Sequence, residues 1–108
     1  MEPHFAHPVE RELARIFDAN GIAWEYEPRT FVLERRADGS IAEAFTPDFY
    51  LPEQDMYLEC TTMRQRLTTR KNRKLRKLRE QGILVTVLYR RDFERLRERH
   101  GFPFDLAA

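Results

Sequence analysis

The sequence predicts a single α/β domain whose elements follow the order α-β-β-β-α-β-α, with a mixed central sheet flanked by helices. Three patterns predict this fold class. Apolar residues recur at helical spacing over 8–20, short segments on either side of Asp38-Gly39 alternate apolar and polar residues, and a basic helical segment precedes the apolar run 83–89. With 108 residues the chain can bury one modest core, so 1–108 is expected to be one domain.

The N-terminal half predicts a helix followed by antiparallel strands. Pro8 suits the first turn of the helix, and Gly21 suits its end. The residues that follow alternate apolar and polar side chains, as in strands with one buried face, and Asp38-Gly39 is a signal for a tight hairpin turn. These segments predict a meander of three or four antiparallel strands. Its strands are expected within 22–27, 30–36, 41–52 and 56–62.

The C-terminal half predicts a basic helix, a buried strand and a last helix. The helix is expected from about 69 to 81, with Gly82 after its end. The run 83–89 is continuously apolar and rich in β-branched residues, as in a strand covered on both faces. A helix that connects two strands favours parallel pairing of this run with 56–61. Residues 91–101 are expected to form the last helix.

The charges are divided unevenly along the chain. Residues 1–61 contain 13 Asp and Glu against five Arg, and residues 62–108 contain 14 Lys and Arg against five Asp and Glu, although the formal net charge is only +1. Nine of the sixteen residues in 64–79 are basic and none is acidic. A solvated helix face usually mixes Glu with Lys, because such pairs stabilise the helix. The run therefore favours a polyanionic partner, with nucleic acid as the expected one.

Several classes of protein are not expected from the composition. The chain has no apolar run of membrane-spanning length and no leader-like N-terminus, so we expect a cytoplasmic protein without a membrane partner. Cys60 is the only cysteine, which excludes an internal disulfide and a cysteine-based zinc site. The histidines, His4, His7 and His100, lack the spacing of zinc ligands. Redox and zinc chemistry are therefore not expected.

The stretch "TPDFYLPEQDMYLECTT", residues 46–62, contains the strongest candidates for a functional site. Asp48 follows a proline, and Glu59 lies within a short apolar strand, where a charged group needs a partner or a metal ion. Strand alternation places Thr61 on the same face as Glu59 and the Cys60 side chain on the opposite face. Asp48 also has a structural alternative, because Pro-Asp is common in turns.

The order of these residues resembles the PD-(D/E)xK nuclease superfamily, whose members share the restriction-endonuclease-like core. The similarity extends from about Glu10 to Tyr89 and includes "VERELARIFDANGIAWEYEP", "TPDFYLP", "YLECTT" and the helix and strand that follow. It implies a metal-dependent DNA endonuclease in which Glu10, Asp48, Glu59 and the backbone carbonyl of Cys60 hold Mg²⁺ or Mn²⁺. Magnesium prefers oxygen ligands and keeps several waters, so a few protein ligands suffice.

The chain departs from the family pattern two residues after Glu59. Where the family usually has a lysine that stabilises charge on the phosphate, this sequence has Thr61, whose hydroxyl can hold a water or a ligand. Lys71 is the cation of the basic helix whose angular position falls between the two buried leucines. We hypothesise that Lys71 takes the catalytic place of the missing lysine, and Lys74 is the second candidate for this role. The alternative is that Lys71 extends past the edge of the core to water.

The other site residues also leave alternatives open. Glu10 can be a first-turn acid that is favoured by the helix dipole. The remaining basic residues are expected to contact phosphates without reading sequence, which favours structure-selective or non-specific binding of DNA. Two other functions remain open: a nuclease fold that only binds nucleic acid, and a small interaction subunit. A homodimer is compatible with a compact nuclease domain that cuts two strands. The expected phosphate contacts, in a loop and on exposed helix faces, are Arg64, Arg66, Arg70, Arg73, Lys74 and Lys77.

Overall fold

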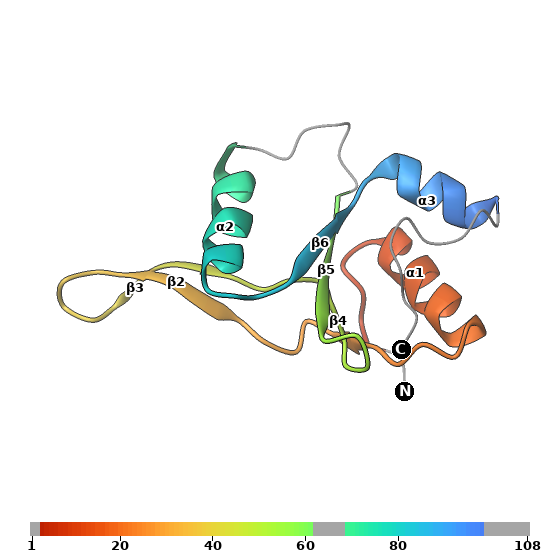
Figure 1. Ribbon diagram of the computed structural model, residues 1–108, viewed down its shortest axis with the longest axis horizontal. Helices are drawn as coiled ribbons and strands as arrows, with labels where there is room; N and C mark the ends of the chain where they lie inside the picture. Colours follow the sequence, from red (N-terminus) through yellow and green to blue (C-terminus); the bar gives the residue numbers. More distant parts are fainter. Residues whose placement is uncertain (1–2, 62–68, 99–108) are drawn as a thin grey trace.

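The computed structural model describes residues 3–61 and 69–98 of the chain (Figure 1). Along these residues a helix is followed by five strands, a second helix, a sixth strand and a third helix. The helices are α1 (Pro8–Ala19), α2 (Thr69–Glu80) and α3 (Arg90–Arg97). The strands are β1 (Glu25–Tyr26), β2 (Phe31–Arg35), β3 (Ile41–Phe45), β4 (Phe49–Leu51), β5 (Met56–Cys60) and β6 (Val85–Leu88).

The central sheet has four strands in the order β1-β4-β5-β6. Strand β4 pairs antiparallel with β1 and β5, whereas β6 pairs parallel with β5. The predicted mixed sheet and the parallel pairing of the apolar run are therefore confirmed. Because β5 and β6 are parallel, α2 must return along the sheet between them, and its first turn lies near the carboxyl end of β5 (Figure 1). This geometry brings the basic helix close to the predicted site.

The expected single meander is wrong, because β2 and β3 form a separate two-stranded sheet. Their hairpin projects away from the central sheet and lies beside α2 (Figure 1). Two features interrupt strand pairing at the base of the hairpin. Glu27 has a positive φ of 46° and is followed by Pro28, and the buried Pro47 between β3 and β4 has no N–H to continue a ladder.

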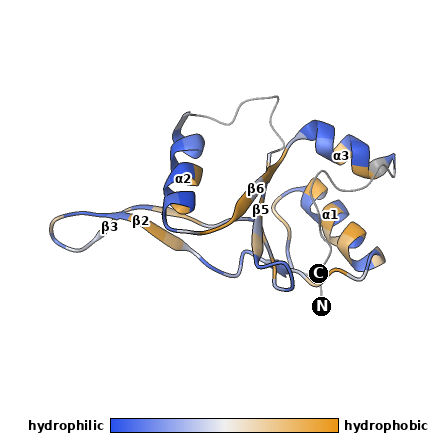
Figure 2. Cartoon of the chain, in the orientation of Figure 1, coloured by the Kyte–Doolittle hydropathy of each residue, from blue (hydrophilic) through white to orange (hydrophobic). Residues whose placement is uncertain are grey.

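Hydrophobic residues cover the central sheet on both faces. One cluster joins α1 and α3 to the sheet through residues such as Phe17, Phe49, Leu58 and Phe93. The other cluster lies between α2, β6 and the hairpin, and its buried members are Phe31, Leu75, Leu78 and Val85. Figure 2 shows the corresponding pattern on α2, which is hydrophilic except on the side toward the sheet. Val85 and Leu88 belong to different clusters, so β6 is covered on both faces as predicted.

Glycines end the first two helices as predicted. After α1, the N–H of Gly21 donates to Asp18 and the N–H of Ile22 donates to Phe17. After α2, Gly82 and the residue that follows make the equivalent pair of bonds, and both glycines have the positive φ that this C-terminal motif requires. Within 3–61 and 69–98, no helix has the length and apolar character needed to cross a lipid bilayer.

Candidate functional site

Asp48 and Glu59 lie side by side because β4 and β5 are paired. Asp48 immediately precedes β4, and the register sets Phe49 opposite Leu58, next to Glu59. The backbone N–H of Asp48 donates to Glu59 Oε1 at 3.2 Å, and the N–H of Cys60 donates to Asp48 Oδ2 at 2.7 Å. The two acids that sequence reasoning ranked first are therefore linked to each other through the backbone of adjacent segments.

The pKa values of the two carboxyl groups are raised, chiefly by burial. Burial, followed by the nearby charge of Glu59, raises the pKa of Asp48 from 3.8 to about 8. Burial also raises the pKa of Glu59, although the ammonium group of Lys71 opposes this rise. Near neutral pH the pKa of Asp48 therefore favours its protonated form, first because burial penalises the charged carboxylate and second because Glu59 lies nearby.

Lys71 faces the sheet, as its angular position on the helix predicts. It lies in the first turn of α2, and its Nζ is 2.5 Å from Glu59 Oε2. The Lys71 side chain is 29% exposed and that of Glu59 is 6% exposed, so a partly exposed lysine forms an ion pair with a buried carboxylate. Lys74 points elsewhere, since its Nζ donates to the carbonyl of Ala44 at 3.1 Å. The structure thus brings Lys71, and not Lys74, to the acid pair.

Thr61 is buried at the carboxyl end of β5. Its N–H donates to the carbonyl of Leu88 at 3.0 Å, which continues the pairing with β6 beyond the last residue of β5. Alternation along this segment places its side chain on the face of Glu59. Thr61 is therefore positioned beside the site, and its catalytic role stays a prediction.

Glu10 is buried and bonded to groups other than the acid pair. Its Oε1 accepts the N–H groups of Ala6 and His7, at 3.1 and 3.3 Å, and the hydroxyl of Tyr26 at 2.8 Å. Glu10 is the third residue of α1, so its bond to the residue before the helix is half of a capping box. Its charge still contributes to the raised pKa of Asp48. These contacts give Glu10 a structural explanation.

We expect the substitution Glu10→Ala to lower the free energy of unfolding by about 1 to 3 kcal/mol, because backbone and phenol donors lose a buried acceptor. Urea denaturation of both proteins would measure the difference. The conservative variant Glu10→Gln retains an acceptor oxygen and should lose less. Equal stability of Glu10→Ala and the unchanged protein would contradict the capping role.

The Cys60 carbonyl is directed toward the segment that precedes β4. Tyr57 and Thr61 donate their N–H groups to carbonyls next to or within β6, so alternation directs the N–H and C=O of Cys60 toward β4. The register of β4 and β5, continued by two residues, sets Pro47 opposite Cys60. Pro47 has no N–H and cannot donate to the Cys60 carbonyl. The proline before Asp48 thereby leaves a backbone oxygen suited to a cation, while burial raises the pKa of the Cys60 thiol.

Asp48, Glu59 and the Cys60 carbonyl form a small, all-oxygen set of donors. Across residues 3–61 and 69–98, no group of three or more His, Cys, Asp and Glu side chains is placed to hold a metal ion. Two carboxylates and one carbonyl fit Mg²⁺ or Mn²⁺ without such a group, because Mg²⁺ keeps several water ligands and both ions favour carboxylate and carbonyl oxygens. The set does not suit a zinc ion, which prefers nitrogen and sulfur.

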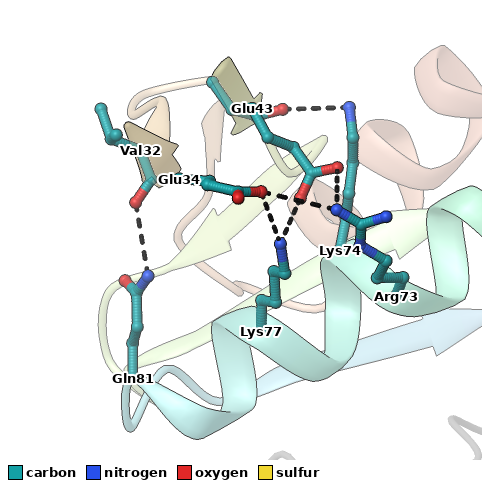
Figure 3. Close-up of polar contacts among 8 residues, drawn as sticks. Val32, Glu34, Glu43, Arg73, Lys74, Lys77 and Gln81 are labelled. Carbon is teal, nitrogen blue, oxygen red and sulfur yellow. Dashed lines mark hydrogen bonds and ion pairs between the residues drawn. The ribbon is translucent and has the colours of Figure 1, made fainter. Parts of the chain in front are cut away.

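The predicted phosphate contacts on α2 differ in their surroundings. Arg70 is exposed as expected, but Lys74 and Lys77 are half-buried, which corrects the expectation that they lie on exposed faces. The reason is the separate hairpin, which lies beside this flank of α2 and supplies acceptors to Lys77 from Glu34 and Glu43 (Figure 3). Arg73 is half-exposed and forms ion pairs with the same two acids. Arg64 and Arg66 lie outside the described residues.

Sequence reasoning missed the roles of Tyr26 and Pro47. The alternating pattern around Tyr26 indicated which side of the strand is buried, but its bond to Glu10 joins residues sixteen positions apart. The sequence shows Pro47 only as the neighbour of Asp48. Its position opposite Cys60 follows from the β4–β5 register. A proline beside a central strand is the available signal, because it removes one N–H from the ladder.

Comparison of the chain with protein-family models, curated proteins and solved structures gives no match. The architecture is a mixed α/β fold with helices on both faces of a mixed sheet.

Proposed function

We propose that the chain is a Mg²⁺- or Mn²⁺-dependent endonuclease that hydrolyses phosphodiester bonds in DNA, as the resemblance to the PD-(D/E)xK superfamily implies. The observation that carries this proposal is the pair formed by the half-buried Asp48 and the buried Glu59, with the ammonium group of Lys71 beside it. Such a group of ionisable residues with raised carboxyl pKa values is typical of functional sites, because burial of ionisable groups lowers the stability of the fold.

Each residue of the site has a chemical role in this proposal. When bound, the cation would polarise the scissile phosphate and lower the pKa of a water. Asp48, Glu59 and the Cys60 carbonyl would hold the ion, and Asp48 must first release the proton that burial favours. Lys71 would stabilise the negative charge that develops on the phosphate. Thr61 would orient a water through its hydroxyl.

The surface chemistry favours binding without sequence recognition. Arg70, Arg76 and Arg79 are exposed on α2, and Arg90, Arg91 and Arg95 are exposed on α3. Long, flexible cations of this kind contact phosphates on any sequence. A structure-selective or non-specific endonuclease is therefore favoured over one that reads bases in the major groove.

A cleavage assay would test the proposed function. Single-stranded, duplex, flapped and four-way DNA would be incubated with the protein in Mg²⁺, in Mn²⁺ and in EDTA. We expect cleavage that requires the cation and falls by about 10³-fold in Asp48→Asn, while the surface variant Glu53→Gln cleaves normally. Cleavage that survives in Asp48→Asn, or that continues in EDTA, would place the activity elsewhere.

A second function, binding of nucleic acid without cleavage, is favoured by one observation. The Lys71 ammonium contacts Glu59 directly, and an ammonium group can balance buried carboxylates without a metal ion. In that case all four DNA substrates would bind at low salt and none would be cut with either cation. The same assay therefore separates the two functions.

A further inference from the structure

The β2–β3 hairpin meets α2 through a group of ion pairs, which we call the clasp: Glu34 and Glu43 from the hairpin, with Arg73 and Lys77 from the helix (Figure 3). Lys77 Nζ lies 3.1 Å from Glu34 Oε2 and 2.9 Å from Glu43 Oε1. Arg73 Nη2 lies 3.5 and 3.6 Å from the same two carboxylates. Two acids thus share two cations of the basic run.

The clasp is open to solvent on one side. Glu34 is 51% exposed and Arg73 is 50% exposed, whereas Lys77 is 25% and Glu43 10% exposed. The hydrogen bond from Lys77 lowers the pKa of Glu43, and the same bond raises the pKa of Lys77, so both groups stay charged at neutral pH. Because Glu34 and Arg73 are half-exposed, a dissolved anion can approach the clasp from this side.

The hairpin has other attachments to α2 that do not depend on the two acids. Phe31 packs in the core with Leu75 and Leu78. Lys74 donates to the carbonyl of Ala44, and the Gln81 amide donates to the carbonyl of Val32 at 3.3 Å (Figure 3). If another anion replaced the two carboxylates as the partner of Arg73 and Lys77, the hairpin would therefore remain docked on α2.

We propose that Glu34 and Glu43 act as an internal competitor for phosphate. In the free protein their carboxylates occupy Arg73 and Lys77, and a DNA backbone must displace them before it can bind these cations. This inference rests on the proposed binding of nucleic acid, and it makes the clasp an autoinhibitory contact. Weak or short polyanions are excluded, whereas a ligand that presents several adjacent phosphates replaces both carboxylates. The basic run, which contains no acid of its own from 64 to 79, receives its acids from the hairpin.

Binding to a fluorescent 20-base-pair duplex in EDTA would test the proposal without any need for cleavage. The variant Glu34→Gln/Glu43→Gln keeps the size of both side chains and frees the cations. Its control, Glu25→Gln/Glu53→Gln, changes the net charge equally at exposed residues outside the clasp. At 0.1 M salt we expect the clasp variant to bind about tenfold more tightly than the control, with a salt slope steeper by about 1 to 2.

A third variant tests whether the gain in DNA affinity comes from Arg73 and Lys77. Addition of Arg73→Gln and Lys77→Gln to the clasp variant should return its affinity to the level of the control or below. A melting temperature of the clasp variant close to that of the unchanged protein would show that the hairpin remains docked. The proposal is overturned if the clasp variant binds no more tightly than the control, if the gain survives loss of both cations, or if no variant binds the duplex. Absence of cleavage with these binding differences intact would overturn only the endonuclease function.

Discussion

Replacement of Lys71 by methionine should lower the kcat of DNA cleavage by about 10²- to 10³-fold, the range found when one group that stabilises transition-state charge is removed. Methionine keeps much of the apolar stem but removes the ammonium group that lies against Glu59. Single-turnover cleavage at saturating protein would measure the chemical step directly. Lys74→Met is the matched comparison on the same helix. Because Lys74 bonds to the hairpin and not to the acid pair, we expect Lys74→Met to retain the original kcat.

Rescue would separate a catalytic role of Lys71 from a structural one. Thr61 lies on the face of Glu59, at the position where the superfamily usually has lysine. In the Lys71→Met background, Thr61→Lys should restore part of the lost kcat, because it supplies an ammonium group from β5 in place of α2. If the Lys71→Met enzyme cleaves DNA at the original rate, Lys71 does not take the catalytic place of the missing lysine. Lost stability with unchanged kcat would leave Lys71 as a structural partner of Glu59.

The inward direction of Lys71 was predictable because it depends only on local geometry. An α-helix turns by a fixed angle per residue, so the positions of Leu75 and Leu78 define the buried stripe and place Lys71 within it. The same reasoning predicted the faces of β5, since side chains alternate along a strand. Gly21 and Gly82 marked helix ends for an equally local reason, the positive φ that both adopt. Local rules therefore predicted most elements and the inward direction of Lys71, whereas the pairing of Asp48 with Glu59 was implied by the resemblance to the nuclease superfamily.

The surroundings of the remaining cations were not predictable, because they depend on contacts between distant segments. Helical spacing separated Lys77 from the buried stripe but could not show that Glu34, 43 residues earlier, would meet it. That contact exists because the hairpin leaves the central sheet at Glu27 and Pro47, and the sequence patterns alone favoured a continuous meander. Glu10 likewise found its partner Tyr26 through the packing of α1 against β1.

The contribution of Asp48 to the stability of the metal-free protein should fall as pH rises from about 4 to 8. Burial and the charge of Glu59 raise the pKa of Asp48 to about 8, whereas its ordinary value is 3.8. Between these values the folded protein holds a proton that the unfolded chain has released, so the contribution of Asp48 to the free energy of unfolding decreases with increasing pH. Asp48→Asn removes this titration. At pH 8 we expect it to be more stable than the unchanged protein by about 1 to 3 kcal/mol, as measured by urea denaturation in EDTA.

Cation binding should have the opposite dependence on pH, because the ion competes with the proton on Asp48. A ligand that binds only the folded state raises the melting temperature by mass action. We expect 10 mM Mg²⁺ or Mn²⁺ to raise the Tm by about 4 °C or more at pH 8.5 and by little at pH 5.5. The surface variant Glu53→Gln should retain this gain, whereas Asp48→Asn should lose it at both values of pH. A gain that is independent of pH and persists in Asp48→Asn would place the ion away from the acid pair. A gain that grows with pH and disappears in Asp48→Asn would identify the Asp48 carboxylate as a ligand, whether or not the bound ion supports cleavage.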